Sequence, residues 1–247
     1  MAGEGGRRYE QVLYRKMNRA GVVPEDFTPA GSDSAAPDMK FYAKNEIWNL
    51  ELKNASSLLD FGQSVIEYSG SSWRLSGTNT VMVGLLRGLG VETIVNENWG
   101  EPHKRTRQSV TVQEAIEDVQ NFGDEYFSVD VNNVIRYYNS KNTFYIQIEG
   151  RGLYYMGSNP AGIPAIPELS GSYKVRLRRK PADTSTLSND LPGTPYTRGY
   201  KVPGTDAGIP FNKNTGLPGA YNFTTAFQAD TLPTASPINL DNILDWL

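Results

Sequence analysis

Apolar residues near the beginning of the chain return every three or four positions. They are Tyr9, Val12, Leu13, Met17 and Ala20, and Gly21 stands just past the last of them. This spacing places them on one face of a helix, so the sequence predicts an amphipathic helix over residues 5–20. Residues 22–37 hold three prolines and two serines, which predicts a loop.

Two short runs after this loop predict a β-hairpin. Residues 39–43 and 47–53 have strand-like composition, and the polar turn 44–46 joins them. In the second run, alternation puts Trp48, Leu50 and Leu52 on one face, which we expect to meet the core. The opposite face then holds Ile47, Asn49, Glu51 and Lys53.

Further elements follow the hairpin. Apolar spacing predicts a helix over 57–68, and the run 80–86 is apolar on both faces, which predicts a strand buried in a sheet. Thr111-Val-Gln-Glu114 has the spacing of a capping box and predicts a helix that Gly123 closes. Strands are expected over residues 143–149, 152–156 and 173–178.

The last part of the chain differs from the rest because prolines are dense there. Residues 181–247 hold 8 of the 15 prolines, which argues against regular helices and central strands. We expect an extended arm over the domain, or partial disorder. The predicted fold class is α/β, with a central mixed β-sheet flanked by helices and a β-rich, Pro/Gly-rich C-terminal extension. The predicted domain is 1–180, with a core of about 5–125 and a β-rich part of about 126–180, and 181–247 is the arm.

Composition narrows the function classes. The 247 residues include no cysteine and one histidine, His103, which excludes disulfide scaffolds, thiol nucleophiles and multi-histidine metal sites. The formal charge of −3 comes from residues 181–247, which hold three basic and six acidic side chains. The neutral remainder argues mildly against a general nucleic-acid binder, so only local basic clusters favour one.

Targeting signals are the next question. No apolar run approaches the length of a membrane span, and the first residues lack the apolar segment of a secretory signal. We therefore expect a soluble protein with no membrane partner. Its expected compartment is the cytoplasm, or the host-cell cytoplasm if a phage encodes it.

The strongest chemical pattern is Pro37-Asp38, followed after twelve residues by Glu51-Leu52-Lys53. Asp38 begins the strand beside Glu51, and neighbouring strands lie about 4.8 Å apart, so the two carboxylates are expected close together. Two such hard oxygen ligands suit one or two Mg²⁺ or Mn²⁺ ions, with water and a phosphate completing the coordination. Lys53 would orient or deprotonate a water, or stabilise charge on the phosphate. The alternative is that Glu51 and Lys53 are a solvent-exposed pair on an ordinary strand.

This pattern resembles the active site of the PD-(D/E)XK nuclease superfamily, which has the restriction-endonuclease-like fold. The resemblance covers about residues 5–90 and is nearest to Holliday-junction resolvases and related phage endonucleases. It implies that Asp38 and Glu51 bind the metal and that Lys53 acts with the attacking water. It also implies that Glu10, on the first helix, reaches the same metal.

The same resemblance indicates residues that meet DNA. Ser32 and Ser34 lie in the loop before Pro37-Asp38, and Gln63 lies on the predicted helix that follows the Glu-Leu-Lys strand. In the resolvase branch of the superfamily, a serine near this loop position meets DNA. At the position of Gln63, several families keep a polar residue near the site.

Two basic clusters are candidates for contact with the DNA backbone. One is the loop with Lys104, Arg105 and Arg107, next to His103, which we expect on the surface without a mechanistic role. The other is a strand on which alternation puts Lys174, Arg176 and Arg178 on one face. The alternative for this strand is an edge position that its charges protect against aggregation.

Several tyrosines are expected either to pack in the core or to stack on unpaired bases. They are Tyr14, Tyr137, Tyr138, Tyr154 and Tyr155. No segment resembles a recognition helix, which slightly favours a nuclease selective for DNA structure over one that reads sequence.

The leading hypothesis is a Mg²⁺-dependent DNA endonuclease that cuts branched or non-regular DNA in recombination, repair or phage replication. A two-fold homodimer would suit symmetric cutting. The acidic and apolar tail 238–247 is expected to dock on its own core or in a groove of a protein partner or second copy. The rivals are a non-catalytic DNA- or protein-binding module with a degenerate nuclease core, and a phage structural protein.

Overall fold

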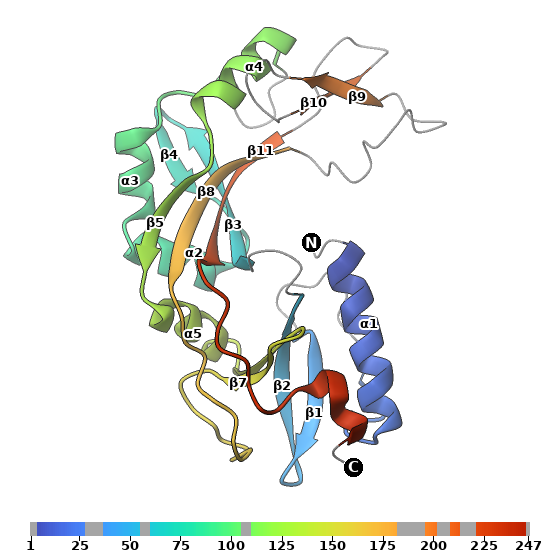
Figure 1. The fold of residues 1–247 in the computed structure, drawn as a ribbon. Coiled ribbons are helices and arrows are strands. Elements are labelled where there is room, and N and C mark those ends of the chain that lie inside the picture. Colours follow the sequence, from blue (N-terminus) through green and yellow to red (C-terminus); the bar gives the residue numbers. More distant parts are fainter. Residues whose placement is uncertain are drawn as a thin grey trace. The chain divides into compact units, whose positions relative to one another are not determined.

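The computed structural model describes residues 4–27, 37–54, 60–104, 110–181, 196–201, 208–212 and 221–245. The chain forms two compact units, each assembled from separate stretches of sequence (Figure 1). The first unit contains residues 1–61, 128–174 and 227–247, and the second contains 62–127 and 175–226. The predicted division at residue 180 stays a prediction, because compact units need not be independently folding domains.

The first unit is built on a mixed four-stranded sheet, which confirms the predicted α/β class. Its strands, in the order β1-β2-β6-β7, are β1 (Met39–Ala43), β2 (Glu46–Lys53), β6 (Thr143–Ile148) and β7 (Gly152–Tyr155). β1 and β2 are antiparallel, β2 and β6 are parallel, and β6 and β7 are antiparallel. The unit also contains helices α1 (Glu4–Arg19) and α5 (Val131–Asn139).

The predicted hairpin is confirmed, with a tighter turn than expected. Met39 pairs with Leu50, and the ladder continues to Ala43 opposite Glu46. Only Lys44 and Asn45 form the turn, and both have positive φ, 50° and 63°. Two successive positive φ values are typical of a type I′ turn, whose twist matches that of the two strands.

The core of the first unit lies between α1 and the sheet. Leu13 and Met17 of the predicted helix are fully buried and belong to the same apolar cluster as Leu50 and Leu52. The expected apolar face of the helix is therefore confirmed, except at Val12, which is 42% exposed. The faces of β2 separate as predicted, with its leucines in this cluster.

The C-terminal tail docks on its own unit over the residues that the structure describes. The Ile238 carbonyl accepts a hydrogen bond from the Leu153 amide at 2.7 Å, and Leu240 is buried in the core. The 3₁₀ helix η2 (Leu240–Asp245) lies against α1, where the Tyr9 hydroxyl donates to the Asp241 carboxylate at 2.9 Å (Figure 1). A protein partner for the tail stays a prediction.

The second unit contains most of a five-stranded sheet of order β4-β3-β11-β8-β5. Its strands are β3 (Asp60–Ser69), β4 (Ser72–Leu75), β5 (Glu125–Val129), β8 (Tyr173–Pro181) and β11 (Tyr221–Ala229). The unit also has α2 (Thr80–Gly88), α3 (Val91–Asn98), α4 (Val112–Asn121) and the antiparallel pair β9 (Tyr196–Lys201) and β10 (Gly208–Asn212). Edge-to-face aromatic rings fill its core, with 4.8 Å between the ring centroids of Trp73 and Phe223.

The predicted helix over 57–68 is wrong, because residues 60–69 form strand β3. Gly62 has a φ of 67°, which interrupts the regular alternation of the strand. The buried positions are therefore Phe61, Ser64 and Ile66, so the period-two burial of a strand is not visible in the apolar residues. Phe61 and Val65 instead have the four-residue step of a helix.

The predicted strand over 80–86 is also wrong, because these residues belong to helix α2. The Asn79 side chain accepts a hydrogen bond from the Met82 amide at 3.1 Å and caps the helix. Met82, Val83 and Leu86 are buried at helical spacing. The cap residue was the sequence signal that distinguished this helix from a strand.

The remaining expectations have mixed outcomes. The Thr111 capping box is confirmed, although α4 ends at Asn121 with Phe122 as its C-cap. The expectation that 181–247 holds no central strand is wrong, because β11 lies between β3 and β8 in a stretch between prolines. β8 is likewise internal, so the edge-strand alternative for it is wrong. Among the described residues, no helix has the length and apolar character needed to cross a bilayer.

Candidate active site

The hairpin brings the two predicted acidic ligands together. Asp38 directly precedes β1, and continuing the Met39–Leu50 register by one position sets it opposite Glu51. The Leu52 amide donates to Oδ2 of Asp38 at 2.9 Å, which holds the Asp38 carboxylate at β2. Strand alternation puts both acids on the face opposite the core leucines.

Glu51 is buried, with an exposed fraction of 6%. Its Oε1 accepts hydrogen bonds from Nζ of Lys53 at 2.7 Å and from the Tyr138 hydroxyl at 3.0 Å. The alternative of a solvent-exposed Glu51–Lys53 pair is therefore wrong. The polar face of β2 is covered at Glu51 by α5, which carries Tyr138.

Lys53 lies in an enclosed and mainly negative environment. Its Nζ is 5.6 Å from the centroid of the Phe61 ring and 5.9 Å from that of Tyr138. Burial lowers the pKa of Lys53, but the charges of Glu51 and Asp38 outweigh burial and raise it overall. Lys53 is therefore a cation at neutral pH in this arrangement, which suits orienting a water or stabilising phosphate charge better than removing a proton.

The pKa of Asp38 is raised to about 7, first by burial and then by the negative charge of Glu51. Lys53 and the Leu52 amide oppose this shift without cancelling it. The site therefore holds more buried negative charge than its lysine neutralises. The hard carboxylate oxygens of Asp38 and Glu51 fit a divalent cation such as Mg²⁺, which would supply the missing positive charge.

Glu10 is the third acid of the predicted metal site. It lies on α1, and its charge raises the pKa of Asp38, although less than Glu51 does. Within the described ranges, no three acidic or histidine side chains form a group suited to hold a metal ion. The role of Glu10 as a ligand stays a prediction, and a cation at Asp38 and Glu51 would also need water or phosphate oxygens.

Four of the predicted DNA-contact residues, Ser32, Ser34, Arg105 and Arg107, lie outside the described residues. Gln63 is exposed on a strand of the second unit and not on the helix expected for it. Lys104 is half-buried in the second unit, and its backbone amide donates to Asp118 at 2.9 Å. Their contacts with DNA stay predictions.

The basic stripe on β8 has the predicted alternation. Its described basic residues Lys174, Arg176 and Arg178 are half-buried and alternate with buried Tyr173, Val175 and Leu177. Lys174 pairs with Asp230 at 2.8 Å, and Arg176 pairs with Asp124 at 3.3 Å. At least part of this stripe is therefore neutralised within the protein, and DNA contact by it stays a prediction.

Tyr138 is the site residue that the sequence did not indicate. It is 87 positions from Glu51 and was one of several tyrosines expected to pack or to stack on bases. A signal was present, because Asp130 caps α5 and buried Val134, Ile135 and Tyr138 follow at helical spacing. That pattern predicts an inward-facing tyrosine, but it does not identify the partner.

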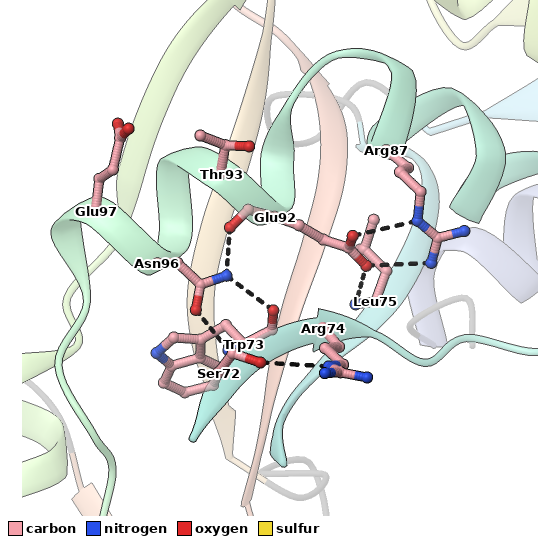
Figure 2. Close-up of a pocket in the computed structure, with 9 residues that line it drawn as sticks. All are labelled: Ser72, Trp73, Arg74, Leu75, Arg87, Glu92, Thr93, Asn96 and Glu97. Atoms are coloured by element: carbon pink, nitrogen blue, oxygen red, sulfur yellow. Dashed lines mark hydrogen bonds and ion pairs between the residues drawn. The ribbon is translucent and has the colours of Figure 1, made fainter. Parts of the chain in front are cut away.

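A second polar cluster lies in the second unit, in an open pocket of about 650 Å³ (Figure 2). There, Oε1 of Glu92 on α3 accepts from the Leu75 amide at 2.9 Å, and Arg87 pairs with the same carboxylate at 3.1 Å. Asn96 accepts from the amide of Trp73 at 2.7 Å and donates to its carbonyl at 3.0 Å. These side chains satisfy backbone hydrogen-bonding groups of the edge strand β4, so their role is structural.

Comparisons with known proteins add little to this geometry. No protein-family model matches the chain, and no curated protein sequence does. The chain is similar to the solved structure of HhaI endonuclease in complex with DNA, with 14% identity and a TM-score of 0.46, over 97% of this chain and 96% of that one. At this TM-score the likeness defines neither the fold family nor the activity of the chain.

Proposed function

We propose that this protein is a divalent-metal-dependent endonuclease that hydrolyses phosphodiester bonds in DNA. The proposal depends on one observation, the gathering of Asp38, Glu51 and Lys53 by the hairpin. The two acids are opposite each other in the register, and Nζ of Lys53 is 2.7 Å from Glu51. Two carboxylates with an adjacent cation provide the residue types that metal-assisted phosphodiester hydrolysis needs.

The residues of the site have separate tasks in this reaction. Asp38 and Glu51 would hold Mg²⁺ or Mn²⁺, which supplies a water of lowered pKa and neutralises charge on the scissile phosphate. Lys53, as a cation beside Glu51, would orient the attacking water and stabilise the charge that develops on the phosphate. Glu10 is expected to assist from α1.

The substrate part of the proposal is DNA of branched or otherwise non-regular structure. Residues 1–180 have no net charge, so the sequence does not predict the broad basic surface that tight binding to regular duplex DNA needs. A homodimer that cuts two strands symmetrically would suit such a substrate.

The test is incubation of labelled junction, flap, single-stranded and linear duplex DNA with the protein in Mg²⁺, in Mn²⁺ and in EDTA. We expect cleavage only with metal, and the strongest cleavage on a branched substrate. Glu51→Gln should abolish it, whereas Glu46→Gln, an exposed glutamate on the same strand, should not. Equal activity of the two variants, or no cleavage of any substrate, would contradict the proposal.

A further inference from the structure

Tyr138 has a fixed position beside the acidic pair. It lies at the end of α5, where Val134 and Ile135 are buried one turn earlier, and its own exposed fraction is 1%. Its ring meets that of Phe61 edge-on, with 6.3 Å between the centroids. A tyrosine ring held by packing and by a helix has little freedom, so its hydroxyl is a donor with a defined location.

The hydroxyl of Tyr138 and Nζ of Lys53 donate to the same atom. Both bonds end on Oε1 of Glu51, at 3.0 and 2.7 Å. A carboxylate oxygen has two lone pairs, so these two donors use the acceptor capacity of Oε1. They also set the orientation of the carboxylate, and neither of them uses Oε2.

The two donors differ in how firmly they hold Glu51. Lys53 has a flexible four-carbon stem and a compact charge, and the proposed reaction requires it to interact with water or phosphate as well. Tyr138 has only two side-chain torsions, and packing restricts both. If Lys53 turned towards a substrate phosphate, Tyr138 would be the donor that still orients Glu51.

We propose that Tyr138 is a positioning residue, which anchors Glu51 through Oε1 and so keeps its carboxylate in an orientation in which Oε2 could serve as a ligand of a metal ion. This inference rests on the proposed function, because it takes Glu51 to be a metal ligand. Removing the hydrogen-bond partner of a metal ligand typically lowers metal affinity about 10- to 100-fold. The expected defect is therefore in metal binding, and a sufficient metal concentration should overcome it.

The test compares Tyr138→Phe with Tyr154→Phe. Tyr154 belongs to the same unit and is equally buried, but its hydroxyl donates to the carbonyl of Thr234 at 2.6 Å and not to the acidic pair. Both substitutions keep the ring and remove one hydroxyl. The melting temperature of each full-length variant is measured in EDTA, to confirm folding, and then across a titration of Mn²⁺ or Mg²⁺ without DNA.

We expect the half-saturating metal concentration of Tyr138→Phe to rise about tenfold or more, while that of Tyr154→Phe equals the wild-type value. Cleavage by Tyr138→Phe should return towards the wild-type rate at saturating metal. The inference is overturned if the half-saturating metal concentration of Tyr138→Phe is unchanged. It is also overturned if the metal does not change the melting temperature of the wild-type protein.

This design separates the two proposals. If Tyr138→Phe shifts the metal midpoint but the wild-type protein cleaves no DNA, the positioning role is supported and the nuclease function fails. If DNA is cleaved and the midpoint does not shift, the function stands and the role of Tyr138 fails. If Tyr138→Phe does not fold, Tyr138→Met is tested in its place, because it fills the site with another apolar side chain and removes the same hydroxyl donor.

Discussion

Two polar clusters of this protein combine similar kinds of charged and donor groups but differ in their electrostatics. In the first unit, Glu51 accepts from Lys53 and from Tyr138 on a helix. In the second unit, Glu92 accepts from Arg87 and from the Leu75 amide. Each cluster thus has a carboxylate, a cation and a second donor.

The difference lies in burial and in the second acid. The hydrogen bond from Arg87 is the main reason that the pKa of Glu92 is lowered, so this carboxylate is stable as an anion. Burial and Glu51 instead raise the pKa of Asp38 to about 7. Perturbation by burial plus a like charge is typical of functional sites, whereas a satisfied ion pair is typical of structural ones.

Among the substitutions that compare the two clusters, the largest effect should come from Lys53→Met, which removes the cation of the first cluster. We expect cleavage to fall about a hundred- to a thousandfold, because a charged donor beside the reacting phosphate is lost. Lys44→Met, at the exposed hairpin turn, is the control and should cut at the wild-type rate. Rates are compared after circular dichroism has confirmed folding, and equal rates would remove the functional contrast between the clusters.

The next effect concerns pH and metal binding. Because the pKa of Asp38 is about 7, a proton competes with the metal below that pH. The half-saturating Mg²⁺ concentration should rise up to about tenfold for each pH unit below 7 and level off above it. It is measured by thermal stabilisation at pH 5.5, 6.5, 7.5 and 8.5, and a midpoint independent of pH would contradict the role of Asp38.

A smaller effect is expected on stability without metal. A carboxyl whose pKa is higher in the folded state than the ordinary value of 3.8 stabilises the fold below that value, and the contribution is lost as pH rises through about 7. Between pH 6 and 8 in EDTA, Asp38 should lower the free energy of unfolding by about 1.4 kcal/mol. Asp38→Asn should lose this pH dependence in denaturant titrations. The control is Asp26→Asn, which replaces an exposed acid in the α1–β1 connection and should retain the pH dependence.

The two regions also differ in what their sequences predict. The hairpin and the closeness of Asp38 to Glu51 follow from local alternation and a short connection, and both were predicted. The exact register was not, because the turn is one residue shorter than expected, with Ala43 opposite Glu46. Tyr138 was not identified as part of the site, because α5 and β2 meet only in the tertiary structure. Side-chain spacing contains no information about such a distant partner.

In the second unit, local patterns were misleading. A positive φ at Gly62 shifted the alternation of β3, so a strand had the spacing of a helix. The apolar run 80–86 is part of a helix that Asn79 caps. The helix buries Met82, Val83 and Leu86 but leaves Val81 39% exposed, whereas the predicted strand was expected to be buried on both faces. The central place of β11 depends on its pairing with β3 and β8, which are remote from it in sequence. The density of prolines in 181–247 therefore did not exclude a central strand there.

The smallest expected effect tests the structural character of the second cluster. Asn96→Ala removes the hydrogen bonds to the amide and carbonyl of Trp73, so the free energy of unfolding should fall by about 1 kcal/mol. Arg87→Gln is the matched control, because it leaves the Trp73 bonds intact and removes only an exposed ion pair, whose loss should change the melting temperature less. Neither variant should alter the metal midpoint or the cleavage rate. A loss of cleavage in folded Asn96→Ala would show that the pocket takes part in function, and the distinction between a catalytic and a structural cluster would then be wrong.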